Sequence, residues 1–409
     1  MASDAALPPR IGRLSRPMRF GRLVALRALP LFLRPAAVAA EGLLPGDGQV
    51  LVVTIPLVAL ALTMSSIPVH VDYFTSSERQ YDHERKGADY CAALTIILIC
   101  GCLALPAFAG MTALVRDPFI LLALPAFFIS EKLIDEVSRL IEFRKQFAAW
   151  SAIQALRSFW LFVPLAFAYR GMSYEAAFLS VSLAVAAGSL ALFVRVYGLR
   201  LNLSVRGFGL IRDKAFYLLG ASLPALYRQG PRIAVASMFP AFAHIYLVAA
   251  QVTQAIALLF DVRFSIPYRK MSARHPRLFH AAWGAKMAVI AGCFLGLACL
   301  YLLPVMLAGL PPLDNALLAA LLAPLLVVEG LTLSLFTFCA GLMPWFVRQY
   351  SASRTYAACL AVHAVLALAL ASTFAAGDQR LLVAIPAANL LGGLAWRAIV
   401  VSRHFGMRG

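Results

Sequence analysis

Arginines lie inside stretches of the chain that are otherwise strongly apolar. Arg27 and Arg34 are seven residues apart, and Arg228 and Arg232 are four apart, so each pair would share one face of a helix. A charge within a membrane-spanning helix needs an ionic partner or a water-filled cavity. Because a guanidinium fork matches phosphate oxygens, convergence of these arginines predicts an electropositive cavity for an anionic head group, such as a lipid pyrophosphate. The alternative is that Arg27 reaches the membrane surface and the others pair with internal carboxylates.

A second group of charges follows a long apolar run. Glu131 and Asp135 would lie on one face of a helix, while Lys132 and Glu136 would lie on the next. One interpretation is a helix that leaves the bilayer with its charges paired among themselves. In the other, Glu131 and Asp135 face a cleft, where they pair with Arg157 of the following helix or carry protons or sodium ions.

Other titratable residues give weaker signals. Glu329 is the only carboxylate deep in the apolar helices expected for the C-terminal half, which makes it a candidate for ion coupling or for an ion pair with Lys286. The seven cysteines form no CxxC pair, and no His/Cys cluster has the spacing of zinc ligands. We therefore expect no bound metal, no cofactor and no catalytic residue.

Composition determines the kind of element that must position these side chains. Of 409 residues, 62% are hydrophobic and only 13% are charged, whereas a soluble domain is about a quarter charged. The apolar runs are continuous, which favours membrane-spanning helices over barrel strands. The sequence thus predicts an all-α integral membrane protein with about twelve transmembrane helices. The expected spans are 22–41, 49–69, 89–113, 117–137, 147–169, 174–194, 214–238, 241–262, 280–308, 315–343, 355–376 and 380–401.

The basic residues test this count of helices. Alternate connections and the two ends hold 26 arginines and lysines, while the opposite connections hold only Arg116, Arg170 and Arg380. Cytoplasmic loops are enriched in basic residues, so both termini are expected in the cytoplasm. The net charge of +17 lies in short gaps between apolar runs, so we expect a lipid bilayer and no nucleic acid as its partner.

The span at 22–41 departs most from an ordinary membrane helix, because its interior holds Arg27 and Arg34 and is broken by Pro30 and Pro35. A cleaved signal peptide ending near Ala40 and an amphipathic helix lying in the interface are the alternatives to a spanning helix. The basic tail at 1–21 would then need a different location.

The chain divides at the basic linker around 195–213. We expect a cytoplasmic tail at 1–21, a six-helix lobe at 22–205 and a second six-helix lobe at 206–409. Since six is even, both lobes enter the membrane from the same side and form two parallel bundles around a central cleft.

Short motifs add a resemblance to this layout. They are the turn at Gly42–Gly48, the unit Glu136-Val137-Ser138-Arg139 with Leu156-Arg157-Ser158-Phe159-Trp160, and Pro231-Arg232 followed by Tyr246. With the twelve helices, they resemble the polysaccharide exporters and O-antigen flippases of the multidrug/oligosaccharidyl-lipid/polysaccharide exporter superfamily. The resemblance implies a multi-pass protein of the bacterial inner membrane that moves a lipid-linked oligosaccharide between leaflets by alternating access. Other membrane proteins of polysaccharide synthesis are then its expected partners.

Three other functions are compatible with the sequence. A cation-coupled multidrug antiporter of the same superfamily would place carboxylates within its N-terminal helices. A membrane glycosyltransferase or polymerase would need acidic groups on sizeable outer loops, and here the first outer loop offers only Glu41 and Asp47. A non-transporting subunit of a polysaccharide export assembly is the third.

Overall fold

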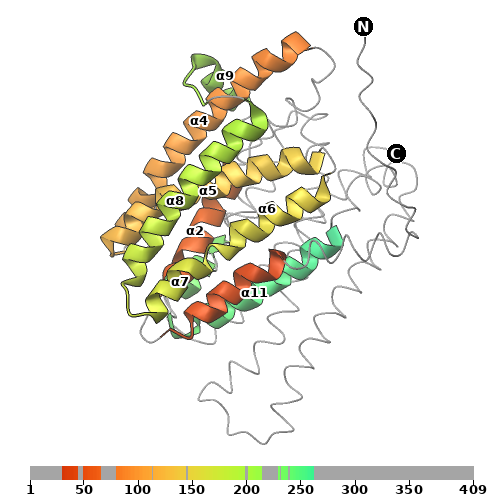
Figure 1. The fold of residues 1–409 in the computed structure, drawn as a ribbon. Helices are drawn as coiled ribbons and strands as arrows, with labels where there is room; N and C mark the ends of the chain where they lie inside the picture. The colour runs from red at the N-terminus through yellow and green to blue at the C-terminus, as the bar shows by residue number, and fades with distance from the viewer. Residues whose placement is uncertain are drawn as a thin grey trace, which may run out of the picture.

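A computed structural model of the protein describes residues 30–44, 49–65, 80–112, 114–143, 146–198, 201–213, 229–230, 232–237 and 240–261. Within these ranges all regular structure is helical (Figure 1). Besides a helix over 30–41 and a short one over 232–237, the helices are α2 (Val50–Met64), α4 (Gln80–Met111), α5 (Pro118–Phe143), α6 (Phe147–Phe159), α7 (Phe162–Tyr169), α8 (Tyr174–Tyr197), α9 (Val205–Asp213) and α11 (Pro240–Asp261).

Several predicted features lie outside the described residues. They are the tail at 1–21, most of the predicted span at 214–238, the four predicted spans beyond residue 262, and the residues Arg27, Arg228, Lys286 and Glu329.

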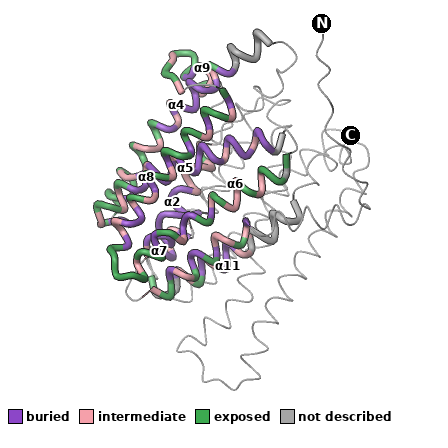
Figure 2. The backbone as a smooth tube through the Cα atoms, viewed as in Figure 1, coloured by how far each residue is buried: buried purple, intermediate pink, exposed green. Residues whose placement is uncertain are grey.

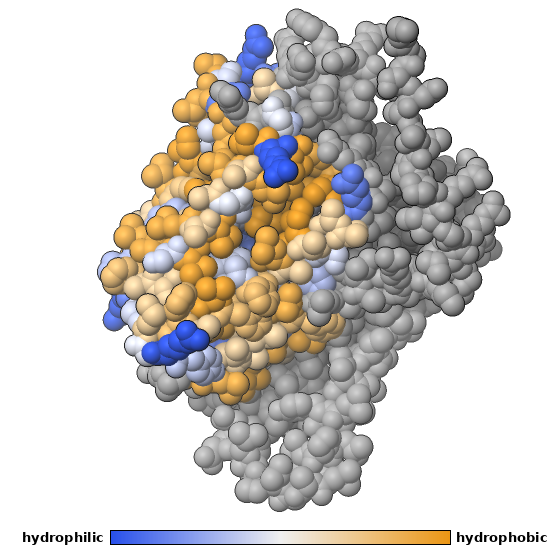
Figure 3. Space-filling view, viewed as in Figure 1, coloured by the Kyte–Doolittle hydropathy of each residue, from blue (hydrophilic) through white to orange (hydrophobic). Residues whose placement is uncertain are grey.

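Three segments of the described chain are long and apolar enough to cross a membrane: Gly87–Met111, Ala148–Tyr169 and Tyr174–Tyr197. Their outward surfaces carry large apolar side chains, such as Leu103, which is 69% exposed. The exposed faces in Figure 2 are largely the hydrophobic faces in Figure 3. Charged side chains such as Glu131 and Lys132 are instead buried. Apolar residues outside and charges inside are the pattern of a protein surrounded by lipid.

Helix α5 is the centre of the described bundle. It packs against α2, α4, α6 and α8 (Figure 1). Phe127 of α5 makes edge contacts with Trp160, at 5.2 Å between ring centroids, and with Phe178 of α8, at 5.9 Å. Because its neighbours surround it, the charged residues in its second half are carried into the interior.

The predicted span at 147–169 is divided into two helices. At Trp160 and Leu161, between α6 and α7, the backbone stays right-handed helical, but from Leu161 its hydrogen bonds shift to the residue three positions earlier. Proline has no N–H to donate to the carbonyl one turn earlier, so Pro164 cannot bond to Trp160. The N–H of Val163 donates to the Trp160 carbonyl instead, at 3.0 Å. The division therefore follows from one proline in the span.

Two predicted connections contain helix. The predicted spans 49–69 and 89–113 leave a connection at 70–88, but α4 begins at Gln80 and the last part of that stretch is helical. The linker at 195–213 contains α9, and Gly207 lies so close to α4 that an added Cβ would be 2.8 Å from the Ala92 backbone. The predicted boundary at 205/206 falls in the first turn of α9.

Two glycines of α4 provide a matched test of this packing. A Cβ added at Gly101 would lie 2.1 Å from the fully buried ring of Phe128, whereas one at Gly110 would meet nothing within 4 Å. Overpacking of this kind typically destabilises by about 1–3 kcal/mol. We therefore expect Gly101→Ala to lower the unfolding temperature of the purified protein in detergent and Gly110→Ala to leave it unchanged. Equal unfolding temperatures for the two variants would contradict the α4–α5 contact.

Candidate functional site

The carboxylate of Glu131 joins three helices. Arg34, from the helix over 30–41, places its Nη2 atom 2.5 Å from Oε1 of Glu131, and Arg157 of α6 places its Nη2 atom 2.6 Å from Oε2. Nε of Arg157 donates to the same oxygen at 2.8 Å. The Glu131 side chain is fully buried, so this contact holds one negative charge between two positive charges away from solvent.

Local sequence helps to place the two arginines. Arg157 lies in the last turn of α6, where the negative end of the helix dipole favours a cation. Arg34 precedes Pro35, which has no N–H to donate to the carbonyl of Leu31 one turn earlier. Leu31, Arg34, Pro35 and Arg157 all line one cavity.

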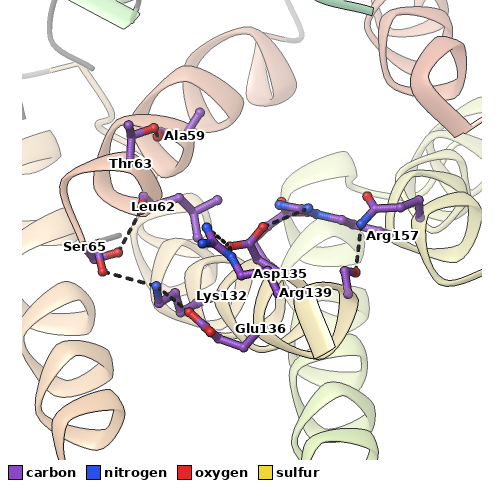
Figure 4. Close-up of polar contacts among 12 residues, drawn as sticks. Ala59, Leu62, Thr63, Ser65, Lys132, Asp135, Glu136, Arg139 and Arg157 are labelled. Atoms are coloured by element: carbon purple, nitrogen blue, oxygen red, sulfur yellow. Dashed lines mark hydrogen bonds and ion pairs between the residues drawn. The ribbon is translucent and has the colours of Figure 1, made fainter. Parts of the chain in front are cut away.

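Four more charged residues of α5, Lys132, Asp135, Glu136 and Arg139, form two further pairs (Figure 4). Asp135 accepts from Nη2 of Arg139 at 2.7 Å and lies 3.9 Å from Nη1 of Arg157. Lys132 lies on the other face, 3.0 Å from Oε1 of Glu136, and also donates to the carbonyl of Ser65 at 3.2 Å. The two i,i+4 pairs on α5 therefore contact different neighbours. Asp135 lies near Arg157 of α6, and Lys132 bonds to Ser65, which follows α2.

Glu136 connects this second face to two more helices. Its Oε2 atom accepts from the hydroxyl of Tyr90 in α4 at 2.7 Å. Its backbone carbonyl accepts from the hydroxyl of Tyr197 in α8 at 2.9 Å, and the Tyr90 and Tyr197 rings stack with centroids 5.8 Å apart. This face of α5 therefore holds α4 and α8 in place, while the Glu131 face holds the helix over 30–41 and α6.

A cavity of about 320 Å³ lies beside the Glu131 face; we call it the arginine cavity. It brings together residues from both predicted lobes. Its lining comprises Pro30, Leu31, Arg34, Pro35, Ile55, Ala59, Asp135, Ser138, Arg139, Trp150, Gln154, Arg157, Ser158, Arg232, Gln251 and Gln254.

Arg232 differs from the other arginines of this cavity. It is 6% exposed, and its bonds in the described structure go to neutral groups: Nη1 to Oε1 of Gln229 and of Gln254, both at 3.3 Å, and Nη2 to the Ala250 carbonyl at 3.4 Å. Its Nε atom has no partner there, and neither do Oε1 and Nε2 of the buried Gln251. A buried charge or amide left unsatisfied is costly, so these groups would be stabilised by a further polar partner.

The charges around the arginine cavity do not balance among the described residues. Arg34, Arg139, Arg157 and Arg232 line it, whereas Asp135 is the carboxylate of the lining and Glu131 lies directly behind it. With few opposing charges and a low-dielectric wall, the excess positive charge attracts anions. The described part of the cavity therefore has the electrostatic character of an anion site.

The structure brings together most of the described residues predicted for a site. Arg34, Asp135, Arg157 and Arg232 line the arginine cavity, and Glu131 holds two of them. Two arginines, Arg34 and Arg157, pair with an internal carboxylate. Arg232 faces the cavity, and among the described residues it has no carboxylate partner. No sequence signal pointed to Trp150 or Arg139 as lining residues. Gln251 and Gln254 are polar residues within the apolar span predicted at 241–262, and Gln254 accepts from Arg232 of another helix.

The chain was compared with protein-family models, with curated proteins and with solved structures, and none of the three comparisons found a match.

Replacement of Glu131 tests its structural role. Glu131→Gln removes a fully buried carboxylate from the guanidiniums of Arg34 and Arg157, which are 22% and 14% exposed. Breaking a buried ion pair typically costs about 3–5 kcal/mol. Asp135→Asn is the matched control, because Asp135 is 27% exposed and its partner Arg139 lies on the same helix. A partly exposed pair of this kind contributes at most about 1 kcal/mol.

We expect Glu131→Gln to lower the unfolding temperature and the yield of monodisperse protein in detergent far more than Asp135→Asn. Similar losses for the two variants would show that Glu131 is not the central contact.

Proposed function

We propose that the protein is a membrane transporter that moves a lipid-linked oligosaccharide between bilayer leaflets by alternating access. The observation that carries this proposal is Arg232, a buried arginine in a cavity shared by both predicted lobes, whose partners among the described residues are neutral. A phosphate oxygen is the natural partner for such a guanidinium.

The cavity offers groups for the two chemical parts of such a head group. Arg232 would bind the diphosphate, with Arg34 and Arg157 shared between it and Glu131. The unsatisfied amide of Gln251 would bond to sugar hydroxyls, and Trp150 would give a sugar ring an apolar face. The lipid tails would remain in the bilayer. Every residue named here acts by binding, so we propose a transporter and no enzymatic step.

The proposed architecture follows from the charge distribution of the sequence. Twelve helices in two parallel six-helix lobes would surround the arginine cavity, with both termini in the cytoplasm of a bacterium and the chain in its inner membrane. Three apolar helices and the buried charges between them support the membrane part of this proposal. Glycan-synthesising membrane proteins would supply the substrate.

A cation-coupled small-molecule antiporter is the second candidate. The observation that favours it is the pair of carboxylates on one face of α5, Glu131 and Asp135, beside a cavity. A proton or cation that bound there would compete with Arg34 and Arg157. In that case Arg232 would be dispensable for substrate and the carboxylates would not.

The test is binding of a polyprenyl diphosphate to the purified full-length protein in nanodiscs. We expect Arg232→Ala to weaken binding roughly tenfold or more, because each charge-assisted hydrogen bond contributes about 1.5–3 kcal/mol. Arg232→Lys, which retains the charge but not the fork, should give an intermediate affinity. Arg206→Ala removes an exposed arginine of α9 and serves as the matched control.

The uncharged polyprenol should bind all four proteins with equal affinity. The proposal fails if Arg232→Ala binds the diphosphate as tightly as the unaltered protein, or if the loss is the same for Arg206→Ala. An antiporter would show the first of these results together with cation-driven uptake of a small molecule.

A further inference from the structure

A second buried carboxylate lies away from the arginine cavity, at the opposite end of the helix over 30–41. Glu41 is 1% exposed and lies where that helix turns toward α2. Its Oε1 atom accepts from the backbone N–H of Leu51 at 2.6 Å, and its Oε2 atom accepts from that of Val52 at 3.2 Å. Glu41 thus caps the N-terminus of α2, where the helix dipole favours an anion.

Two side chains from distant parts of the sequence complete the contact. The hydroxyl of Tyr174, the first residue of α8, donates to Oε1 of Glu41 at 2.9 Å. Nε2 of His244, near the start of α11, lies 3.1 Å from Oε2. With these four partners, the lone pairs of the Glu41 carboxylate are all engaged.

The imidazole determines whether this contact is an ion pair. His244 is 20% exposed at its side chain and gives Glu41 a full ion pair only when it carries a second proton. Histidine is the side chain whose charge ordinarily changes between about pH 5 and 8. Among the described residues, Tyr174 bonds to Glu41, the Tyr169 hydroxyl donates to the neighbouring Ala40 carbonyl at 3.2 Å, and Glu175 follows Tyr174 in α8. Arg116 and Asp117 lie across an adjoining cavity of about 550 Å³ that Tyr174 and Glu175 also line.

The contact joins the two predicted lobes. Glu41, α2 and α8 belong to the lobe expected at 22–205, and α11 belongs to that expected at 206–409. In the proposed topology this end of the helices faces outward, where the His244 side chain, which is 20% exposed, can exchange protons directly. The packing is close, since a Cβ on Gly42 would lie 3.3 Å from the His244 ring.

We propose that Glu41 and His244 form a proton-binding site that ties the two lobes together at the outer end of the helices. With the proton bound, the ion pair holds that end closed and the arginine cavity is shut off from the outside. Without the proton, one neutral contact remains and the lobes separate there. The inference rests on the proposed function for its topology and its two-state motion, but not for the identity of the substrate.

Accessibility of the arginine cavity from the outside tests this site. Ala59 lines the cavity on α2, and Ala59→Cys in a cysteine-free full-length chain gives a single thiol there. We would measure its labelling in spheroplasts by a membrane-impermeant maleimide. The labelling rate would be divided by that of Met172→Cys, a 56% exposed position on the outer turn, to remove the pH dependence of the reagent.

The normalised rate should be severalfold higher at alkaline than at acid pH, because the ion pair exists only while the imidazole carries its second proton. His244→Gln leaves the Glu41 cap of α2 intact, and it should give the higher rate at both pH values. Glu175→Gln, a neighbouring carboxylate that accepts from Ser173, should retain the pH dependence of the unaltered chain.

If His244→Gln does not fold, Gly42→Val provides the test. The valine side chain would displace the His244 ring, so the labelling rate of Ala59→Cys should again be high and independent of pH. A rate in these variants that equals that of the parent at each pH would overturn the proposal. Since this measurement uses no glycan lipid, its failure would leave the anion site standing. Loss of the anion site would appear only in diphosphate binding.

Discussion

The buried carboxylate of Glu131 is the contact on which the described structure depends. It lies at the centre of the central helix and accepts from guanidiniums of two other helices. In a medium of low dielectric none of the three charges is stable alone. The ion pairs therefore fix how the helix over 30–41 and α6 sit against α5, and the arginine cavity forms along the same face.

The same constraint separates structural charges from those free to bind a ligand. Arg34 and Arg157 have a carboxylate partner, as do Lys132 and Arg139, so the bundle holds together without a ligand. Arg232 has only neutral partners in the described structure. In the proposed function such a site would bind an anion reversibly, because release of the anion would not unpair the charges that maintain the fold. That property suits a transporter, which must release what it binds.

The sequence predicted those features that repeat along one helix. The i,i+4 relation of Lys132 and Glu136 follows from spacing, and the need of Arg157 for a partner follows from its position in an apolar run. The division of the span at 147–169 could have been read from Pro164. Spacing could not reveal that Glu131 also binds Arg34, 97 residues away, or that Glu41 meets His244, 203 residues away. Those contacts depend on how helices pack, which periodicity within one helix does not encode.

The most direct test of the central claim is a cryo-electron microscopy structure of the full-length protein in nanodiscs with a polyprenyl diphosphate. The account predicts density for the diphosphate within hydrogen-bond distance of the Arg232 guanidinium, with Glu131 still bonded to Arg157. Arg232 paired with a carboxylate of the protein, and no phosphate in the arginine cavity, would contradict it.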